Sequence, residues 1–176
     1  MNNIYVSNNF KNTHFQDNAK YLDIFQELTI LMVDDDENIL FFITEVFEIY
    51  EINIITTSNG LKAFEIIEQC EVDLLISNIN MPGKDGYWLI NKVRKLASPR
   101  KREIPAVAFT GSTEYQKILA SGFNLYIQKP SPMQKLIREI AKLLQSSAKS
   151  VNLEPGQQVE LRQNPDFLKK LGFNEI

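Results

Sequence analysis

The sequence predicts an α/β fold in which helices cover both faces of a five-stranded parallel sheet. Five short apolar segments alternate with segments whose apolar residues recur at helical spacing. Polar residues follow four of the apolar segments directly, as they do at the site-bearing edge of such sheets. The chain of 176 residues is long enough for one domain of this kind with further segments at both ends.

The five predicted strands are short and consist mainly of apolar and β-branched residues. Strands that are apolar on both faces are typical of a parallel sheet covered on both sides. For this alternating pattern we expect the flavodoxin-like strand order 2-1-3-4-5, with the site outside the carboxyl ends of the strands. The predicted strands cover residues 29–33, 52–57, 72–77, 104–109 and 123–127.

Helix-capping residues mark the starts of several predicted helices. Ser58 or Asn59 is placed to cap the second helix and Asp85 the third, because a short polar side chain accepts hydrogen bonds from free backbone N–H groups there. Ser131 and Pro132 have the order of a cap followed by proline at the first helical position. The predicted helices cover residues 39–49, 59–69, 86–96, 113–119 and 132–145.

We divide the chain into three parts. Residues 1–28 form an N-terminal extension with a short amphipathic helix behind Asp17, residues 29–146 the α/β domain, and residues 147–176 a tail. The tail contains Asn164 followed by proline, which predicts one more short helix. The apolar residues expected to pack elsewhere are Tyr21, Leu22, Ile24, Phe25 and Leu28 in the extension, and Phe167, Leu168, Leu171 and Phe173 in the tail.

Composition and charge exclude several classes of function. The formal net charge of −3 gives no general attraction to nucleic acid, and the basic stretch between Lys92 and Arg102 has no interleaved aromatic residues, so we interpret it as a solvated helix face and loop. A single cysteine, Cys70, fits a reducing compartment. No signal-peptide core or bilayer-spanning apolar run occurs. We therefore expect a cytoplasmic protein that binds neither nucleic acid nor membrane.

The strand ends carry the residues of the predicted site. Strand one ends in Asp34 and Asp35, strand three in Asn78, strand four in Thr110 and strand five in Lys129. Because the carboxyl ends of parallel strands meet at one edge of the sheet, we expect these side chains to lie together. Adjacent carboxylates form an oxygen-rich pocket of the kind that Mg²⁺ prefers.

This ordered set resembles the receiver domain of response regulators, over roughly residues 29–145. The segment from Val72 to Gly86, with its Met-Pro and glycine-rich turn, is similar to the third strand and active-site loop of that family. The resemblance implies that Asn78 occupies the position of an aspartate that accepts a phosphoryl group. It further implies a magnesium site formed by Asp34, Asp35, the residue at position 78 and the backbone carbonyl of Asn80.

The resemblance also assigns three roles outside the metal site. Thr110 is similar to the switch hydroxyl that hydrogen-bonds the phosphoryl group, and Lys129 to the lysine that pairs with it. Tyr126 is similar to the aromatic residue that reports the state to the outer face. The residues alone leave other interpretations open: a helix-start acid cluster for residues 34–36, a plain N-cap for Thr110 and ordinary packing for Tyr126.

Asn78 changes the chemistry that the resemblance implies. An amide is not a carboxylate nucleophile, so no acyl phosphate can form at this position. The pocket also loses one negative charge, whose Coulomb attraction for a unit charge near 4 Å is about 4 kcal/mol at an effective dielectric constant of 20. We therefore expect weak Mg²⁺ binding and an ion pair of Lys129 with Asp34 or Asp35. Asn78 is either natural, in a pseudo-receiver, or an altered aspartate.

The resemblance implies a single-domain, non-enzymatic receiver of a two-component phosphorelay that signals through protein–protein contact. Its implied partners are a sensor histidine kinase or phosphotransfer protein, a downstream protein target and a second copy in a homodimer. One alternative is a phosphorylation-independent interaction or dimerisation module.

Two other classes share parts of the pattern. A haloacid-dehalogenase-like phosphatase would need threonine or valine where Asn38 stands, and a late acidic pair that the sequence lacks. A flavin-binding protein would need a phosphate-binding loop after strand one, where acidic residues 34–36 stand instead.

Overall fold

The computed structural model describes residues 23–25 and 27–150, and it contains one five-stranded sheet. All neighbouring strands are parallel, and their order is β2-β1-β3-β4-β5. This confirms the predicted flavodoxin-like order. The strands are β1 (Thr29–Val33), β2 (Asn53–Thr57), β3 (Leu74–Ser77), β4 (Ala106–Thr110) and β5 (Leu125–Gln128).

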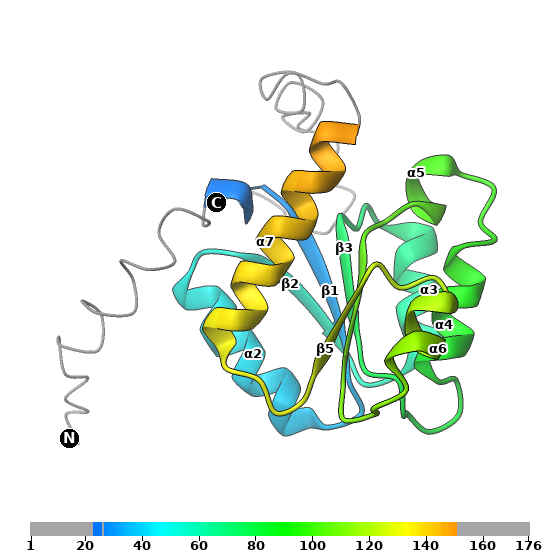
Figure 1. Cartoon of the computed structure of the whole chain (residues 1–176), viewed down its shortest axis with the longest axis horizontal. Helices are drawn as coiled ribbons and strands as arrows, with labels where there is room; N and C mark the ends of the chain where they lie inside the picture. Colours follow the sequence, from blue (N-terminus) through cyan, green and yellow to red (C-terminus); the bar gives the residue numbers. More distant parts are fainter. Residues whose placement is uncertain (1–22, 26, 151–176) are drawn as a thin grey trace, which may run out of the picture.

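Helices cover both faces of the sheet (Figure 1). Buried residues of α2 and α7 pack on one face, and those of α3, α4 and α6 pack on the other. None of the helices in the described part of the chain is long and apolar enough to cross a membrane. The helices are α2 (Glu37–Ile49), α3 (Gly60–Gln69), α4 (Gly86–Val93), α5 (Pro99–Arg102), α6 (Tyr115–Ala120) and α7 (Met133–Ser150), with the 3-10 helix η1 (Asp23–Phe25) before β1.

Alternating strand residues divide the core into two apolar layers. Met32 of β1 faces α2 and α7 with its neighbours Ile30 and Ile76, whereas Leu31 and Leu75 face the helices on the other side. Successive side chains of a strand point to opposite faces, so each central strand contributes to both layers. All of these side chains are fully buried. Their burial explains why β1, β3 and β4 read as continuous apolar runs.

Two predicted caps are confirmed and one is wrong. Asn59 accepts hydrogen bonds from the backbone N–H groups of the first turn of α3, and Asp85 accepts one from Trp88 at 2.7 Å. The side-chain oxygen of Ser131 has no hydrogen-bond partner, and α7 begins at Met133. Pro132 instead offers its backbone oxygen to the first turn of that helix.

Arg94 departs from the expected solvated basic face. Its guanidinium donates to the backbone oxygens of Gly122 at 2.9 Å, Arg102 at 2.7 Å and Ile104 at 2.8 Å, and to the Asn124 side chain at 3.0 Å. Burial lowers the pKa of Arg94. The residue therefore ties the end of α4 to the segments before β4 and β5. The predicted third helix accordingly ends at Val93, and the short helix α5 that follows was not predicted.

The described end of the N-terminal extension is packed into the domain. Phe25 of η1 is 1% exposed and belongs to the apolar layer under α2 and α7. Most of the predicted helix behind Asp17, and the whole predicted tail helix, lie outside the described residues. The division at residues 28 and 146 therefore stays a prediction.

Phe25→Ala is expected to lower the free energy of unfolding by about 3 kcal/mol or more, because it leaves a cavity in a closed apolar layer. Phe41→Ala is the matched control, since Phe41 is 68% exposed, and its effect is expected to stay below about 1 kcal/mol. Chemical denaturation followed by circular dichroism measures both. An equal decrease in the free energy of unfolding of the two variants would show that Phe25 is not part of the core.

Candidate functional site

The carboxyl ends of β1, β3, β4 and β5 bring the predicted polar residues to one edge of the sheet. The strand hydrogen bonding continues one residue beyond these strands: the N–H of Asn78 donates to Val33 at 2.8 Å, and that of Lys129 donates to Thr110 at 2.8 Å. These bonds fix the backbone at the positions where the chain leaves the sheet. Asp34 and Thr110 are fully buried, and Asn78 is 9% exposed.

The side-chain amide of Asn78 lies at the centre of this edge. Its nitrogen, Nδ2, donates to Oδ1 of Asp35 at 2.9 Å, to the backbone oxygen of Asn80 at 3.2 Å and, over a longer distance of 3.4 Å, to Oδ1 of Asp34. The three acceptors are the oxygens that the receiver resemblance assigns to a magnesium ion. In this structure they converge on an amide nitrogen of the chain itself.

The direction of the amide follows from its surroundings. Its oxygen accepts a hydrogen bond from the backbone N–H of Ile79 at 2.8 Å. If the amide were turned over, its oxygen would face three other acceptors and its NH₂ would face an N–H donor. Only the observed direction satisfies all of these groups. The residue pattern alone did not predict this network, because an amide can donate or accept in either direction.

Lys129 forms an ion pair with the buried carboxylate of Asp34. The sequence left Asp34 and Asp35 open as partners, and the structure selects Asp34. Burial raises the pKa of Asp34 from its ordinary value, while the Lys129 ammonium acts in the opposite direction. The N–H of Asp36 donates to the same carboxylate at 3.3 Å. Asp34 thus has partners on both oxygens.

The acidic residues after β1 do not act together as a helix-start cluster. Asp36 is the N-cap of α2 and accepts a hydrogen bond from the N–H of Asn38 at 2.9 Å. Asp34 and Asp35 instead face Asn78. The helix-start interpretation is therefore correct for one of the three residues only.

The loop after Asn78 is closed by tight contact with α4. The N–H of Gly86 donates to Ile79 at 2.9 Å, and a Cβ atom at Gly86 would lie only 2.3 Å from the backbone oxygen of Asn78. No residue other than glycine fits this approach without a backbone shift. Ser77 is fully buried and donates to the same oxygen at 2.7 Å. Both residues hold the backbone from which the Asn78 side chain extends.

Thr110 and Tyr126 meet at Ser112, in the loop after β4. The Thr110 hydroxyl accepts the N–H of Ser112 at 3.2 Å, and the Tyr126 hydroxyl donates to the backbone oxygen of Ser112 at 2.8 Å. The N-cap of α6 is Glu114, so Thr110 is not a plain N-cap. These two predicted switch residues thus bind the same loop residue.

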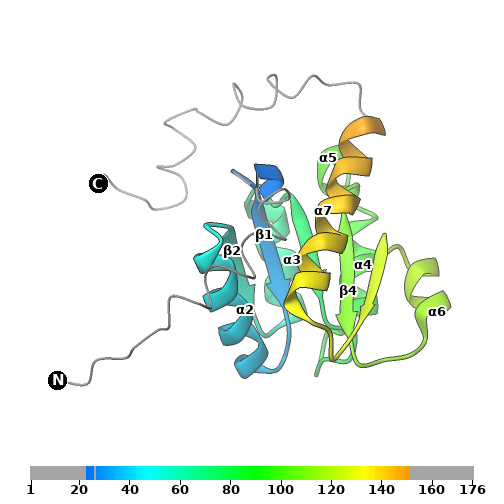
Figure 2. The same ribbon diagram turned by 60° about the vertical axis from the view of Figure 1, so that its left-hand side comes forward.

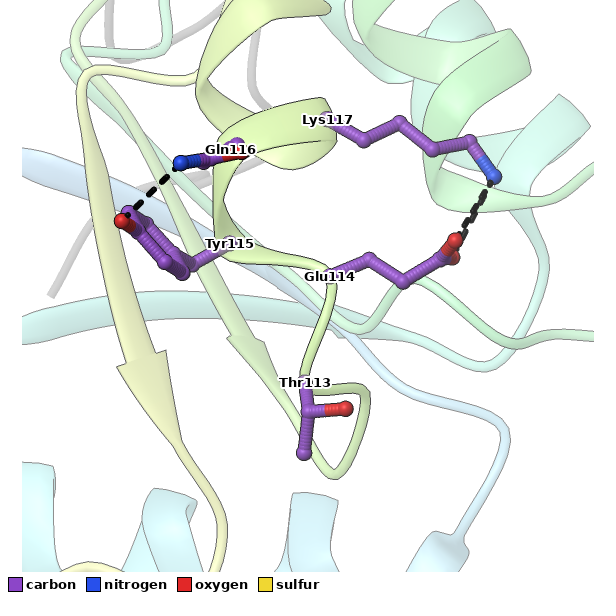
Figure 3. Close-up of a pocket in the computed structure, with 5 residues that line it drawn as sticks. All are labelled: Thr113, Glu114, Tyr115, Gln116 and Lys117. Carbon is purple, nitrogen blue, oxygen red and sulfur yellow. Dashed lines mark hydrogen bonds and ion pairs between the residues drawn. The ribbon is translucent and has the colours of Figure 1, made fainter.

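A shallow hollow lies at the start of α6 (Figure 3). It contains none of the predicted site residues, and its polar lining is largely paired: Lys117 lies 3.2 Å from Glu114, and Gln116 donates to Tyr115. We therefore place the candidate site at the strand ends and not in this hollow. The lining residues are Thr113, Glu114, Tyr115, Gln116 and Lys117.

A sequence profile described as the response regulator receiver domain matches residues 30–141. This chain belongs to that family. Its members are signalling proteins of two-component systems, which confirms the predicted family and the prediction that the chain is not an enzyme. The phosphatase and flavin alternatives are set aside.

Two individual relatives are similar to this chain over its α/β domain. The chain is 34% identical over 115 residues to an uncharacterised 14.6 kDa protein of Leptolyngbya boryana, covering 64% of this chain and 86% of that protein. It is 30% identical over 117 residues to the heme response regulator HssR of Staphylococcus aureus, covering 65% of this chain. The match covers 50% of the length of that regulator.

A solved structure shares the fold. Response regulator protein TrrA from Thermotoga maritima, in complex with Mg²⁺ and BeF, is 28% identical with a TM-score of 0.59, and the match covers 66% of this chain and 98% of that one. That relative therefore holds Mg²⁺ in its complex.

The residues of this chain do not fit a magnesium ion as they are arranged. The point on which the oxygens of Asp34, Asp35 and Asn80 converge is taken by the Asn78 amide nitrogen, and the other oxygen of Asp34 binds Lys129. Across residues 23–25 and 27–150, no group of three or more His, Cys, Asp or Glu side chains is placed to hold a metal ion. A cation would have to displace the amide.

Lys129→Met is expected to lower the free energy of unfolding by about 3 kcal/mol at neutral pH, because it leaves the buried Asp34 carboxylate unpaired. Without the ammonium, burial loses its strongest opposing influence, and the pKa of Asp34 rises further above the unfolded value. The loss is therefore complete above that folded-state pKa and shrinks as the pH falls through it. Urea denaturation at several pH values measures this.

The control for this change is Lys117→Met, which removes an exposed ammonium of a surface pair and should leave stability unchanged. A loss in Lys129→Met that does not depend on pH would contradict an ion pair with Asp34.

Proposed function

We propose that this receiver acts in two-component signalling through protein–protein contact, without forming an acyl phosphate at Asn78. Asn78 takes the phosphoacceptor position, and Asp34, Asp35 and the Asn80 carbonyl take the metal positions. Thr110, Lys129 and Tyr126 take the switch positions. This assignment rests on the family and on the arrangement of these residues at the carboxyl ends of the strands.

The observation that carries the proposal is the hydrogen bonding of the Asn78 amide. An acyl phosphate requires a carboxylate nucleophile, and the amide nitrogen here is committed as a donor to three oxygens. The amide oxygen carries no carboxylate charge and accepts a hydrogen bond from the N–H of Ile79, so it is a poor nucleophile. The polar groups of the Asn78 amide and the oxygens around it are therefore hydrogen-bonded without a phosphoryl group.

The amide also supplies part of what a cation would supply. A hydrogen bond to a charged group contributes about 1.5–3 kcal/mol when its geometry is good. Asn78 makes one such bond of normal length, to Asp35, and a longer one to Asp34. It also contributes no negative charge of its own. We infer that the site keeps its shape without metal and that Mg²⁺ binds weakly.

The expected partners follow from the family and not from any contact in the structure. They are a sensor histidine kinase or phosphotransfer protein and a downstream protein target, in the cytoplasm, with a homodimer as a further state. Asn78 has the same chemistry in this chain whether it is the natural residue or replaces a natural aspartate. Codon 78 of the natural gene distinguishes these two origins.

Asn78→Asp is expected to gain a labile adduct of one phosphoryl group on treatment with acetyl phosphate and Mg²⁺, because it restores the carboxylate in an otherwise complete set of site residues. Mass spectrometry of the intact protein and its peptides measures the gain. The matched control is Asn80→Asp, which makes the same chemical change two residues away, at an exposed side chain. No adduct is expected there or in the unchanged protein.

A phosphoryl group on the unchanged Asn78 protein, at a residue of this site, would overturn the proposal. Failure of Asn78→Asp to react would show that the site differs from reactive receivers by more than this residue.

Without metal, Asn78→Asp is also expected to be less stable than the unchanged protein, by on the order of 2 kcal/mol, since a third carboxylate replaces the donor. Mg²⁺ should restore this loss and raise the Tm of the variant, while the Tm of the unchanged protein stays nearly constant. Titration calorimetry should give a Kd for Mg²⁺ at least about tenfold weaker in the unchanged protein. Equal Mg²⁺ affinity in the two proteins would contradict the role assigned to the amide.

A further inference from the structure

The outer side of α2 carries large apolar side chains that the described core does not use. Phe41, Phe42 and Ile49 are 68%, 57% and 59% exposed, whereas Ile43 and Phe47 on the inner side are fully buried. The helix thus has apolar residues on both sides. Exposed apolar groups gathered on one helix are typical of a surface that another segment covers. We call Phe41, Phe42 and Ile49 the outer α2 face.

Acidic residues accompany the outer α2 face. Glu37, Glu45 and Glu48 are exposed, and α2 contains no lysine or arginine. Among the residues that the structure describes, none forms an ion pair with these three carboxylates. A segment that covers this surface well must therefore combine apolar side chains with positive charge.

The chain itself contains a segment with this chemistry. Residues 167–173 read Phe-Leu-Lys-Lys-Leu-Gly-Phe, which places Lys169 and Lys170 between two apolar pairs. The apolar residues of this segment are the ones that the sequence predicted to pack on another surface. We propose that residues 167–173 dock on the outer α2 face of the same chain.

The connection is long enough for this docking. The helix α7 ends at Ser150, so residues 151–166, sixteen in all, lie between it and the proposed docking segment. At about 3.3 Å per residue they span up to roughly 50 Å. Buried residues of α2 and α7 pack on the same sheet face, and in Figure 1 α2 lies in the lower part of the molecule while α7 rises past it to the upper edge.

Tethering makes even a weak contact effective. A connection of sixteen residues gives the segment an effective concentration of about millimolar at the face, so an intrinsic Kd in that range is enough to cover the face half of the time. Figure 2 shows α2 on the outside of the molecule, where a partner protein can reach it. A partner protein that binds the same surface must first displace the segment. The docked segment therefore competes with partners of α2.

Cross-linking with a carbodiimide tests the proposal on the full chain. The reagent joins a lysine amine to a nearby carboxylate, and an equal mixture of ¹⁴N- and ¹⁵N-labelled protein at micromolar concentration separates links within one chain from links between two. We expect links from Lys169 and Lys170 to Glu45 and Glu48 within single chains, at a yield that does not change on dilution. Peptide mass spectrometry identifies them.

Substitution of the outer α2 face provides the matched comparison. The double variant Phe41→Ser, Phe42→Ser should lower the yield of these links by about tenfold, because it removes two apolar contacts from exposed positions. Leu61→Ser is the control: Leu61 is also exposed, at 46%, but it belongs to α3 on the opposite sheet face. That variant should leave the yield unchanged.

Three outcomes would overturn the proposal. Links that join differently labelled chains would show that a second copy covers the face. A yield that the double phenylalanine change leaves unaltered would show that the apolar face is not the docking site. The third is an absence of links to α2 while the nearby pair Lys142 and Glu139, 3.0 Å apart, cross-links normally.

Discussion

The donation of the Asn78 amide to oxygens on three sides is the interaction on which the site depends. Asp34, Asp35 and the Asn80 carbonyl all present acceptors to one point, and acceptors placed together repel unless a donor or a cation lies between them. Most receivers are expected to meet this need with a metal ion. In this chain one side chain supplies the donor, and the N–H of Ile79 fixes the direction of that side chain.

The fold holds this interaction in place from several directions. The parallel register of β1 and β3 brings residues 34 and 78 next to one another, and Gly86 allows α4 to lie directly on the backbone of Asn78. Lys129 arrives from β5 and satisfies the remaining oxygen of Asp34. These contacts come from the ends of β1, β3 and β5 and from the start of α4. The site is therefore a property of the whole sheet edge and not of one loop.

The elements that sequence predicts well are those that local patterns determine. Apolar periodicity located all five strands to within two residues, and the cap Asp85 could be predicted from residue type alone. Ser58 and Asn59 were both candidates for the next cap, and the structure selects Asn59. Arg94 was misjudged because its partners come from distant segments, and Ser131 because α7 begins only at Met133. The site positions were predicted by strand order, but the direction of the Asn78 amide was not, since it depends on which groups face each of its two ends.

The proposed function places control of this receiver outside the site, and the charge of the site gives the reason. Two carboxylates, Asp34 and Asp35, stand against one ammonium, Lys129, so the site carries a net charge of −1, and an aspartate at position 78 would make it −2. One lysine and one amide satisfy the smaller charge without a divalent cation. On the proposed function, such a site gains little from binding metal or phosphate. A ligand shifts an equilibrium only by its differential affinity for the two states. On that proposal a change of state starts at another surface, and the outer α2 face, where a partner must displace residues 167–173, provides one.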